Sequence, residues 1–133
     1  MTNAHGGFEV EITRDSDDDS ADGTVLGSLK GTKRFHGDLE GSSRGRMLTG
    51  MTAREGSAGY VLIERVQGRL QGRTGSFLLQ HFGIMDRGVP RLTIEVIPDS
   101  GTDELAGIQG RMTIQVSGAD HSYDFEFSFV GRP

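Results

Sequence analysis

Apolar and polar residues alternate along most of this chain, and the period of two returns after each turn-like break. Phe8, Val10 and Ile12 alternate with polar residues near the start, and residues 123–129, YDFEFSF, repeat the pattern near the end. Successive side chains of a β-strand point to opposite faces, so this pattern is typical of strands with one buried face. No long window carries an apolar face at helical spacing. The sequence therefore predicts an all-β chain.

Short turns separate eight candidate strands. They cover residues 8–13, 25–35, 46–51, 58–70, 73–85, 91–97, 107–116 and 122–130. Short links favour an antiparallel meander, and eight strands can close into a barrel whose interior holds side chains or one small ligand. The alternative is a two-sheet sandwich, which prefers Greek-key links and longer crossovers. We therefore predict an eight-stranded antiparallel meander β-barrel.

The length of the chain fits this architecture as one domain. A chain of 133 residues buries roughly two thirds of its unfolded surface, which is enough for a core of its own. We expect a single β-barrel domain over residues 1–133, with a polar N-terminal segment at residues 1–6 and an acidic loop at residues 15–23. The 21 glycines follow no Gly-x-y period, which indicates turns and kinked strands.

Charge and composition exclude several classes of function. The net charge of −5 argues against a nucleic-acid surface, because such surfaces cluster Lys and Arg. The absence of cysteine excludes disulfides, thiolate nucleophiles and thiolate metal sites. The sequence has neither a signal peptide pattern nor an apolar run of the roughly 18 residues that a membrane span needs. We expect a cytoplasmic protein that binds neither nucleic acid nor membrane.

The register of the central hairpin decides which polar side chains point into the barrel. A two-residue turn at residues 71–72 places Leu62 opposite His81 and Glu64 opposite Leu79. One face then carries Tyr60, Leu62, Glu64, Val66, Phe77, Leu79 and His81. The other face is more polar, so we expect the first face to point inward and to bring Glu64 and His81 together as diagonal neighbours.

Glu64 and His81 are the candidate catalytic residues. An unpaired buried carboxylate is costly, so an inward Glu64 needs a partner or a raised pKa, and Lys33 and His81 are the available partners. One interpretation is a structural ion pair or an outward-facing Glu64; the other is a general acid or base in an apolar cavity, where Tyr60, Gln80 or Lys33 steers a polar group of the ligand. The residues that we expect to contact a ligand are Lys33, Phe35, Met47, Tyr60, Leu62, Phe77 and Leu79.

Two other motifs suggest chemistry that their context does not support. Residues 41–45, GSSRG, match the nucleophile elbow pattern with Ser43 in the nucleophile position. That pattern requires a strand, a sharp turn and a helix in an α/β sheet, so we interpret the segment as a hairpin loop. Residues 15–23 resemble a calcium loop but lack the glycine and the final glutamate that it needs, which favours a solvated loop. The four histidines lie far apart, so we predict no metal and no cofactor.

The strand around His81 is apolar on both faces and therefore needs cover on both sides. The barrel interior covers Phe77 and Leu79, whereas Leu78 and Phe82 would point outward. Because outward apolar side chains of this kind mark interfaces, we expect a homo-oligomer, with Gln80 at or near the contact.

Three segments carry a resemblance to a known group of proteins. They are residues 33–41, KRFHGDLEG, residues 60–83, YVLIERVQGRLQGRTGSFLLQHFG, and residues 97–114, IPDSGTDELAGIQGRMTI. With them, the chain from about residue 8 to residue 129 resembles small bacterial proteins of unknown function among the allene oxide cyclase-like barrels. The glycine-rich part of the last segment is also similar to plant allene oxide cyclases, dirigent proteins and bacterial spirotetronate cyclases.

This resemblance implies an eight-stranded barrel, usually a homo-oligomer, with an apolar cavity open at one end. The enzymes in the group fold a flexible substrate into one geometry, so positioning and exclusion of water direct its cyclisation. In the glycine-rich segment, Leu105 is expected to plug one end of the barrel. No catalytic residue is carried over from the resemblance.

Three hypotheses for function follow. The first is a barrel that binds a small apolar molecule and acts on it as an isomerase or cyclase. The second is a non-catalytic carrier or sensor of a similar molecule. The third is a structural or interaction protein whose lumen is filled by its own side chains.

Overall fold

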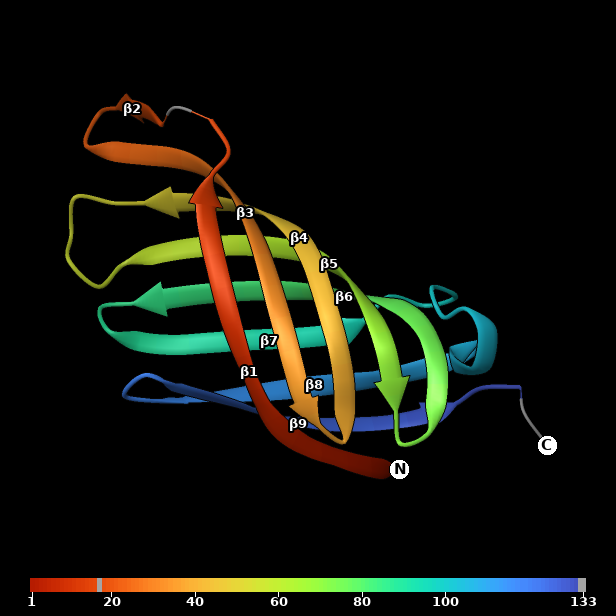
Figure 1. Ribbon diagram of the computed structural model, residues 1–133. Coiled ribbons are helices and arrows are strands. Elements are labelled where there is room, and N and C mark those ends of the chain that lie inside the picture. Colours follow the sequence, from red (N-terminus) through yellow and green to blue (C-terminus); the bar gives the residue numbers. More distant parts are fainter. Residues whose placement is uncertain (17, 132–133) are drawn as a thin grey trace.

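The computed structural model describes residues 1–16 and 18–131, and β-strands make up most of this part of the chain (Figure 1). The elements in chain order are β1 (Thr2–Arg14), β2 (Asp19–Ala21), β3 (Thr24–Gly37), β4 (Leu39–Met51), β5 (Ala58–Leu70), β6 (Arg73–Asp86), β7 (Val89–Val96), the short 3₁₀-helix η1 (Asp103–Leu105), β8 (Ile108–Ser117) and β9 (Asp120–Phe129).

The sheet closes on itself. From β3 to β9 each strand pairs antiparallel with the next strand in sequence, and β1 joins the two ends by pairing with both β9 and β3. The predicted eight-stranded antiparallel meander barrel is therefore confirmed, with β2 as an additional strand beside β3. The sandwich alternative is wrong because β1 pairs with β3 and so closes one continuous sheet.

Two segments outside the predicted strands contribute residues to the sheet. β1 begins at Thr2, inside the expected polar segment, and Ala4 is fully buried opposite Phe125. In the acidic segment, Asp19–Ala21 forms β2, and a tight turn at residues 22–23 with two positive φ angles, 54° and 80°, reverses the chain into β3. Charge alone suggested a loop there, but the turn residues Asp-Gly favour a hairpin.

The central hairpin has the predicted register. Gln71 and Gly72 form its turn with φ angles of 48° and 86°, as a type I′ turn requires. β5 and β6 therefore pair Leu62 with His81 and Glu64 with Leu79. The face of this hairpin that carries Glu64 and His81 points into the barrel.

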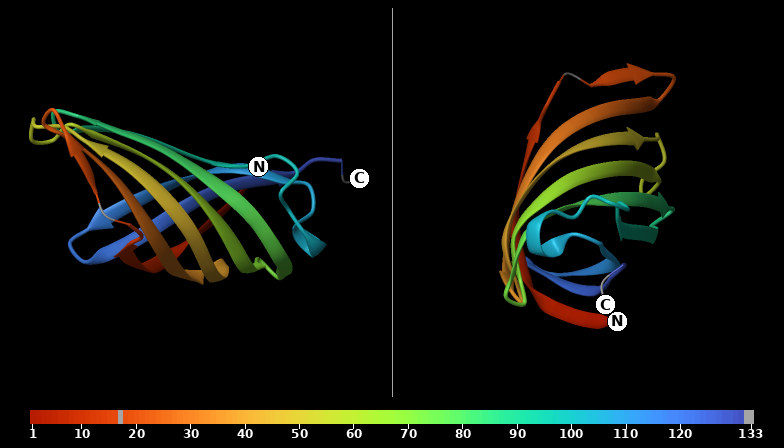
Figure 2. Two further views of the ribbon diagram at one scale, coloured as in Figure 1. Left: turned by 90° about the horizontal axis from the view of Figure 1, so that it is seen from above. Right: turned by 90° about the vertical axis from the view of Figure 1, so that its right-hand side faces the viewer.

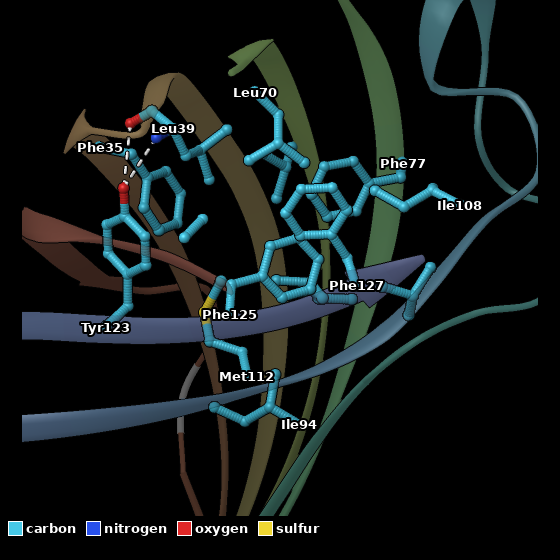
Figure 3. Close-up of a cluster of buried hydrophobic side chains, with 14 of the residues drawn as sticks. Phe35, Leu39, Leu70, Phe77, Ile94, Ile108, Met112, Tyr123, Phe125 and Phe127 are labelled. Carbon is cyan, nitrogen blue, oxygen red and sulfur yellow. Dashed lines mark hydrogen bonds between the residues drawn. The ribbon is translucent and has the colours of Figure 1, made fainter. Parts of the chain in front are cut away.

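One end of the barrel is packed with aromatic and aliphatic side chains (Figure 3). Phe77 stacks on Phe125 with ring centroids 5.7 Å apart. The Tyr123 hydroxyl accepts a hydrogen bond from the backbone N–H of Leu39 at 2.9 Å and donates one to the backbone oxygen of His36 at 2.9 Å. Leu105 in η1 is fully buried at this end, as expected of a plug. The buried side chains at this end therefore form one packed core.

The other end of the barrel is open because two of its seams stop early. The ladder between β1 and β3 ends at the pair of Arg14 and Leu29. β7 and β8 share only two residue pairs, Ile94 with Met112 and Glu95 with Arg111. The ends of β3 to β7 continue beyond these seams and fan away from β1, β8 and β9 (Figure 2). We call this curved extension the flared sheet.

Candidate functional site

A cavity of about 210 Å³ occupies the lumen at the open end. Seven strands contribute to its walls, namely β1, β3, β4, β5, β6, β8 and β9. The residues that line it are Phe8, Val10, Ile12, Leu29, Lys30, Gly31, Lys33, Ser43, Gly45, Met47, Tyr60, Leu62, Glu64, His81, Ile114, Val116 and His121. Ile12 and Val116 on the rim are 53% and 62% exposed, so the cavity reaches solvent there. One water fills about 10–15 Å³ of such a volume, so the lumen is not filled by its own side chains at this end.

Lys33, Glu64 and His81 meet at the inner end of this cavity. The Oε2 atom of Glu64 accepts hydrogen bonds from the Nζ of Lys33 at 2.8 Å and from the Nε2 of His81 at 2.6 Å. Both Glu64 and His81 are only 2% exposed. The structure therefore brings together the two residues proposed as catalytic and the predicted cationic partner of Glu64. We call these three residues the polar cluster.

The charge state of Glu64 follows from its two partners. Burial by itself raises the pKa of this carboxyl, but the hydrogen bond from His81 and the charge and hydrogen bond of Lys33 outweigh burial and lower the pKa to about 2. Glu64 is therefore ionised near neutral pH and is not suited to act as a general acid. Its negative charge instead fixes the imidazole ring, because an ionised Oε2 requires the proton on Nε2 of His81.

Two atoms of the polar cluster have no hydrogen-bond partner among the described residues, namely Oε1 of Glu64 and Nδ1 of His81. The carboxylate oxygen is an acceptor. With the proton on Nε2, the Nδ1 atom of a neutral imidazole is an acceptor as well. Buried acceptors without a donor are costly, so this end of the cavity is complementary to a group that donates hydrogen bonds.

Ser43 was not predicted as a wall residue. It lies within β4, opposite Lys33 and Val66, and is 3% exposed, so the interpretation of its segment as a hairpin loop is wrong. The Gly and Ser content suggested a turn, but Gly41, Ser43 and Gly45 alternate with exposed residues along β4, as in a strand whose other face points to the lumen. The signal that could have found Ser43 is its parity with Met47 in the alternating pattern.

The glycines on the same walls leave space above the polar cluster. Gly31 and Gly45 are directly paired across β3 and β4. A Cβ atom on Gly45 would lie 2.8 Å from the Cβ of Glu64, so this position must stay small. A Cβ atom on Gly31 would meet nothing closer than 3.8 Å, so Gly31 borders the free space itself.

The predicted ligand contacts divide into two groups. Lys33, Met47, Tyr60 and Leu62 line the cavity. The other three, Phe35, Phe77 and Leu79, are at most 1% exposed and lie in the packed core. All seven side chains point inward. Those toward the open end of the barrel line the cavity, and those toward the packed end belong to the core.

Tyr60 forms the part of the wall nearest the flared sheet. Its ring centroid lies 6.3 Å from that of His81. The ring covers Gly83 on the neighbouring strand, where a Cβ atom would come within 2.3 Å of it. Burial and the charge of Glu64 raise the pKa of Tyr60. Tyr60 is therefore a neutral, amphipathic wall residue whose position depends on a glycine.

Within residues 1–16 and 18–131, no group of three or more His, Asp or Glu side chains is arranged to hold a metal ion. In the same residues, no helix has the length and apolar character needed to cross a membrane.

The outer face of the hairpin carries an apolar patch, which we define as Leu48, Val61, Ile63 and Phe82 and call the outer patch. Leu48, Val61 and Phe82 stand in one row across β4, β5 and β6. Phe82 is 54% exposed, whereas Leu78 on the same strand is half-buried.

Comparisons with known proteins give a family without an assigned activity. A crystal structure of a protein of unknown function from the DUF3224 family of Shewanella oneidensis MR-1 is similar to this chain, with 48% identity and a TM-score of 0.92 over 97% of this chain and 98% of that chain. No curated protein matches the chain. Residues 4–127 match the family described as "Protein of unknown function (DUF3224)". The chain therefore belongs to the DUF3224 family.

Proposed function

We propose that this barrel binds a small, mainly apolar molecule in its open cavity and acts on it as an isomerase or cyclase. The observation that carries the proposal is the polar cluster at the inner end of an otherwise largely apolar cavity, with two buried acceptor atoms left without partners. Such a combination of apolar walls and few convergent polar groups is typical of small-molecule sites.

The ligand's polar group follows from the polar cluster. Oε1 of Glu64 and Nδ1 of His81 both accept hydrogen bonds, so the ligand carries a donor such as a hydroxyl or an enol. A carboxylate would place a second negative charge beside Glu64. The walls formed by Phe8, Val10 and Leu62 take up the apolar remainder of the molecule.

His81 is the group that exchanges a proton with the ligand. Its Nδ1 takes a proton from the bound molecule, and the resulting imidazolium is stabilised by ionised Glu64 at 2.6 Å from Nε2. The same proton returns to another atom of the ligand, so the reaction is an isomerisation without a net change in composition. Lys33 is a positioning residue because it holds Glu64 from the side opposite His81.

Cyclisation is a special case of this chemistry. A cavity of about 210 Å³ with an apolar wall holds a flexible molecule in one folded geometry and keeps water from it. The resemblance of the sequence to the allene oxide cyclase-like barrels supports this form of the proposal by analogy only.

A non-catalytic carrier is the second candidate. The pairing of Glu64 with Lys33 and His81 favours it, because an ionised carboxylate that is already paired serves binding and structure without further chemistry. In a carrier, His81 would hold the ligand through a hydrogen bond and exchange no proton.

The test begins with the molecule that co-purifies with the protein from its source cells, detected by native mass spectrometry and identified after extraction. An isomerase or cyclase converts that molecule or its precursor, and His81→Phe removes turnover while the apolar walls still bind the molecule, more weakly because one hydrogen bond is lost. His121→Phe, on the same cavity wall but outside the polar cluster, is the matched control. A carrier binds but shows no turnover in the wild type. If no molecule co-purifies and the wild type also fails to bind 2-naphthol, an apolar probe with one hydroxyl, the proposal is wrong.

We further propose that the protein forms a homo-oligomer through the outer patch. Val61, Ile63 and Phe82 are 42%, 49% and 54% exposed on adjacent strands, and contiguous apolar surface of this kind is favourable to bury against a second copy.

A further inference from the structure

A second hollow, of about 380 Å³, lies on the inner face of the flared sheet across β4 to β7. The residues that define it, for which we use the name methionine groove, are Met47, Met51, Tyr60, Met85, Pro90 and Leu92. It lies beyond the last residue pairs between β7 and β8.

The methionine groove is apolar and exposed. Met51, Met85 and Leu92 are 55%, 39% and 41% exposed. Exposed apolar surface that is concave and contiguous is unfavourable in water unless something covers it. Methionine side chains adapt to occupants of different shape, because they are unbranched and rotate about three bonds.

The groove is continuous with the open cavity. Met47 and Tyr60 belong to the walls of both hollows. Tyr60 also lies next to the polar cluster, with its ring 6.3 Å from that of His81. An apolar chain whose polar end is held by His81 would therefore pass Met47 and Tyr60 to reach the groove.

We propose that the ligand is an elongated molecule, with a hydrogen-bond donor at the polar cluster and a flexible apolar chain that lies in the methionine groove. This inference rests on the proposed function and specifies its substrate class as apolar alcohols or enols with an extended chain. Met47 and Tyr60 line both the cavity and the methionine groove, so a molecule bound in the cavity can extend into the groove. We therefore infer that the groove holds a part of the same ligand. A compact ligand would fill the cavity and leave the groove exposed.

The test uses a series of straight-chain primary alcohols, hexanol, octanol, decanol and dodecanol, with the dissociation constant measured by isothermal titration calorimetry. Full burial of a methylene strengthens binding about fourfold, and burial on one side by an open groove about twofold. We expect hexanol to bind in the cavity and the longer alcohols to gain about twofold per added methylene.

Variants in the groove separate this inference from the proposed function. Met51→Gln and Met85→Gln should leave hexanol binding unchanged and remove most of the gain for decanol and dodecanol. Leu26→Gln is the matched control, because Leu26 is 60% exposed on β3 and lies outside both hollows. Thermal unfolding of each variant shows that the fold is retained.

Three outcomes would overturn the inference. In the first outcome, hexanol binds but the longer alcohols bind no more tightly, or their affinity rises with chain length as much in the Met85→Gln variant as in the wild type. The groove then does not hold the chain, and the cavity proposal stands. If Met51→Gln and Met85→Gln convert an oligomer to a monomer in light scattering, a second copy covers the groove. If 2-naphthol binds but neither hexanol nor a longer alcohol competes with it, the inference about a chain-bearing ligand fails while the proposed function stands.

Discussion

Replacing Glu64 by Gln removes one negative charge from the barrel interior while keeping the shape of the side chain. The carboxylate is 2% exposed and accepts hydrogen bonds from Lys33 and His81, of which Lys33 carries the positive charge. In the variant, the Lys33 ammonium, whose side chain is 11% exposed, loses its counter-charge. Removing one partner of a buried ion pair is more damaging than removing both, because the remaining charge is uncompensated.

The magnitude follows from the pKa of Glu64. The value falls from 4.5 to about 2 on folding, a difference of about 2.5 units, which corresponds to about 3 kcal/mol at 1.36 kcal/mol per unit. The folded-state pKa is lowered, so this stabilisation is fully present above about pH 5 and is lost as the pH falls toward 2. Glu64→Gln should therefore lower the free energy of unfolding by about 3 kcal/mol near neutral pH and by much less at about pH 2.

Urea denaturation of wild type and variant across this pH range measures the difference. Glu95→Gln on the outer face of β7 is the control and should change stability by less than about 0.5 kcal/mol. The double variant Lys33→Met with Glu64→Gln should recover part of the lost stability, because it leaves no unpaired cation. A cost below about 1 kcal/mol for Glu64→Gln, or a cost that does not depend on pH, would refute the reasoning.

Three further perturbations test the site and the surface. Gly31→Leu should fill the cavity and weaken binding of 2-naphthol by at least about tenfold, whereas Gly31→Ala, with 3.8 Å to its nearest neighbour, should retain binding in the same titration. Gly83→Ala should displace the Tyr60 ring, because the added Cβ would lie 2.3 Å from it. The free energy of unfolding, measured by urea denaturation, should fall by about 1–3 kcal/mol. Gly50→Ala is the control and should leave this free energy unchanged, because an added Cβ there has nothing within 4 Å. Phe82→Gln should lower the oligomer mass measured by light scattering without lowering the thermal midpoint of the monomer, and an unchanged mass would argue against the outer patch as the interface.

The sequence predicted which side chains point into the barrel, but not which of them line the cavity and which belong to the packed core. The period of two and the Gln-Gly turn determine the register of β5 and β6, and register determines that Glu64 and His81 share the inner face. Because a buried carboxylate must be paired, Lys33 could be foreseen as its partner although it lies two strands away.

Position along the barrel axis could not be predicted in the same way. Phe77 and His81 share one face of β6, but Phe77 belongs to the packed end and His81 to the cavity. What separates them is the staggered closure of β1 on β3 and β9, which no local pattern encodes. Ser43 was missed because small residues in a strand look like a turn when their neighbours in space are unknown.

The short seam between β7 and β8 makes one part of the barrel wall easier to open than the rest. Only two residue pairs join these strands, whereas β5 and β6 are paired along their whole length. Amide hydrogens on the β8 side of β7 should therefore exchange with solvent much faster than those between β5 and β6. The first of these pairs involves Ile94, two residues from Leu92 of the methionine groove, so the part of the wall that opens most easily is the part next to this groove.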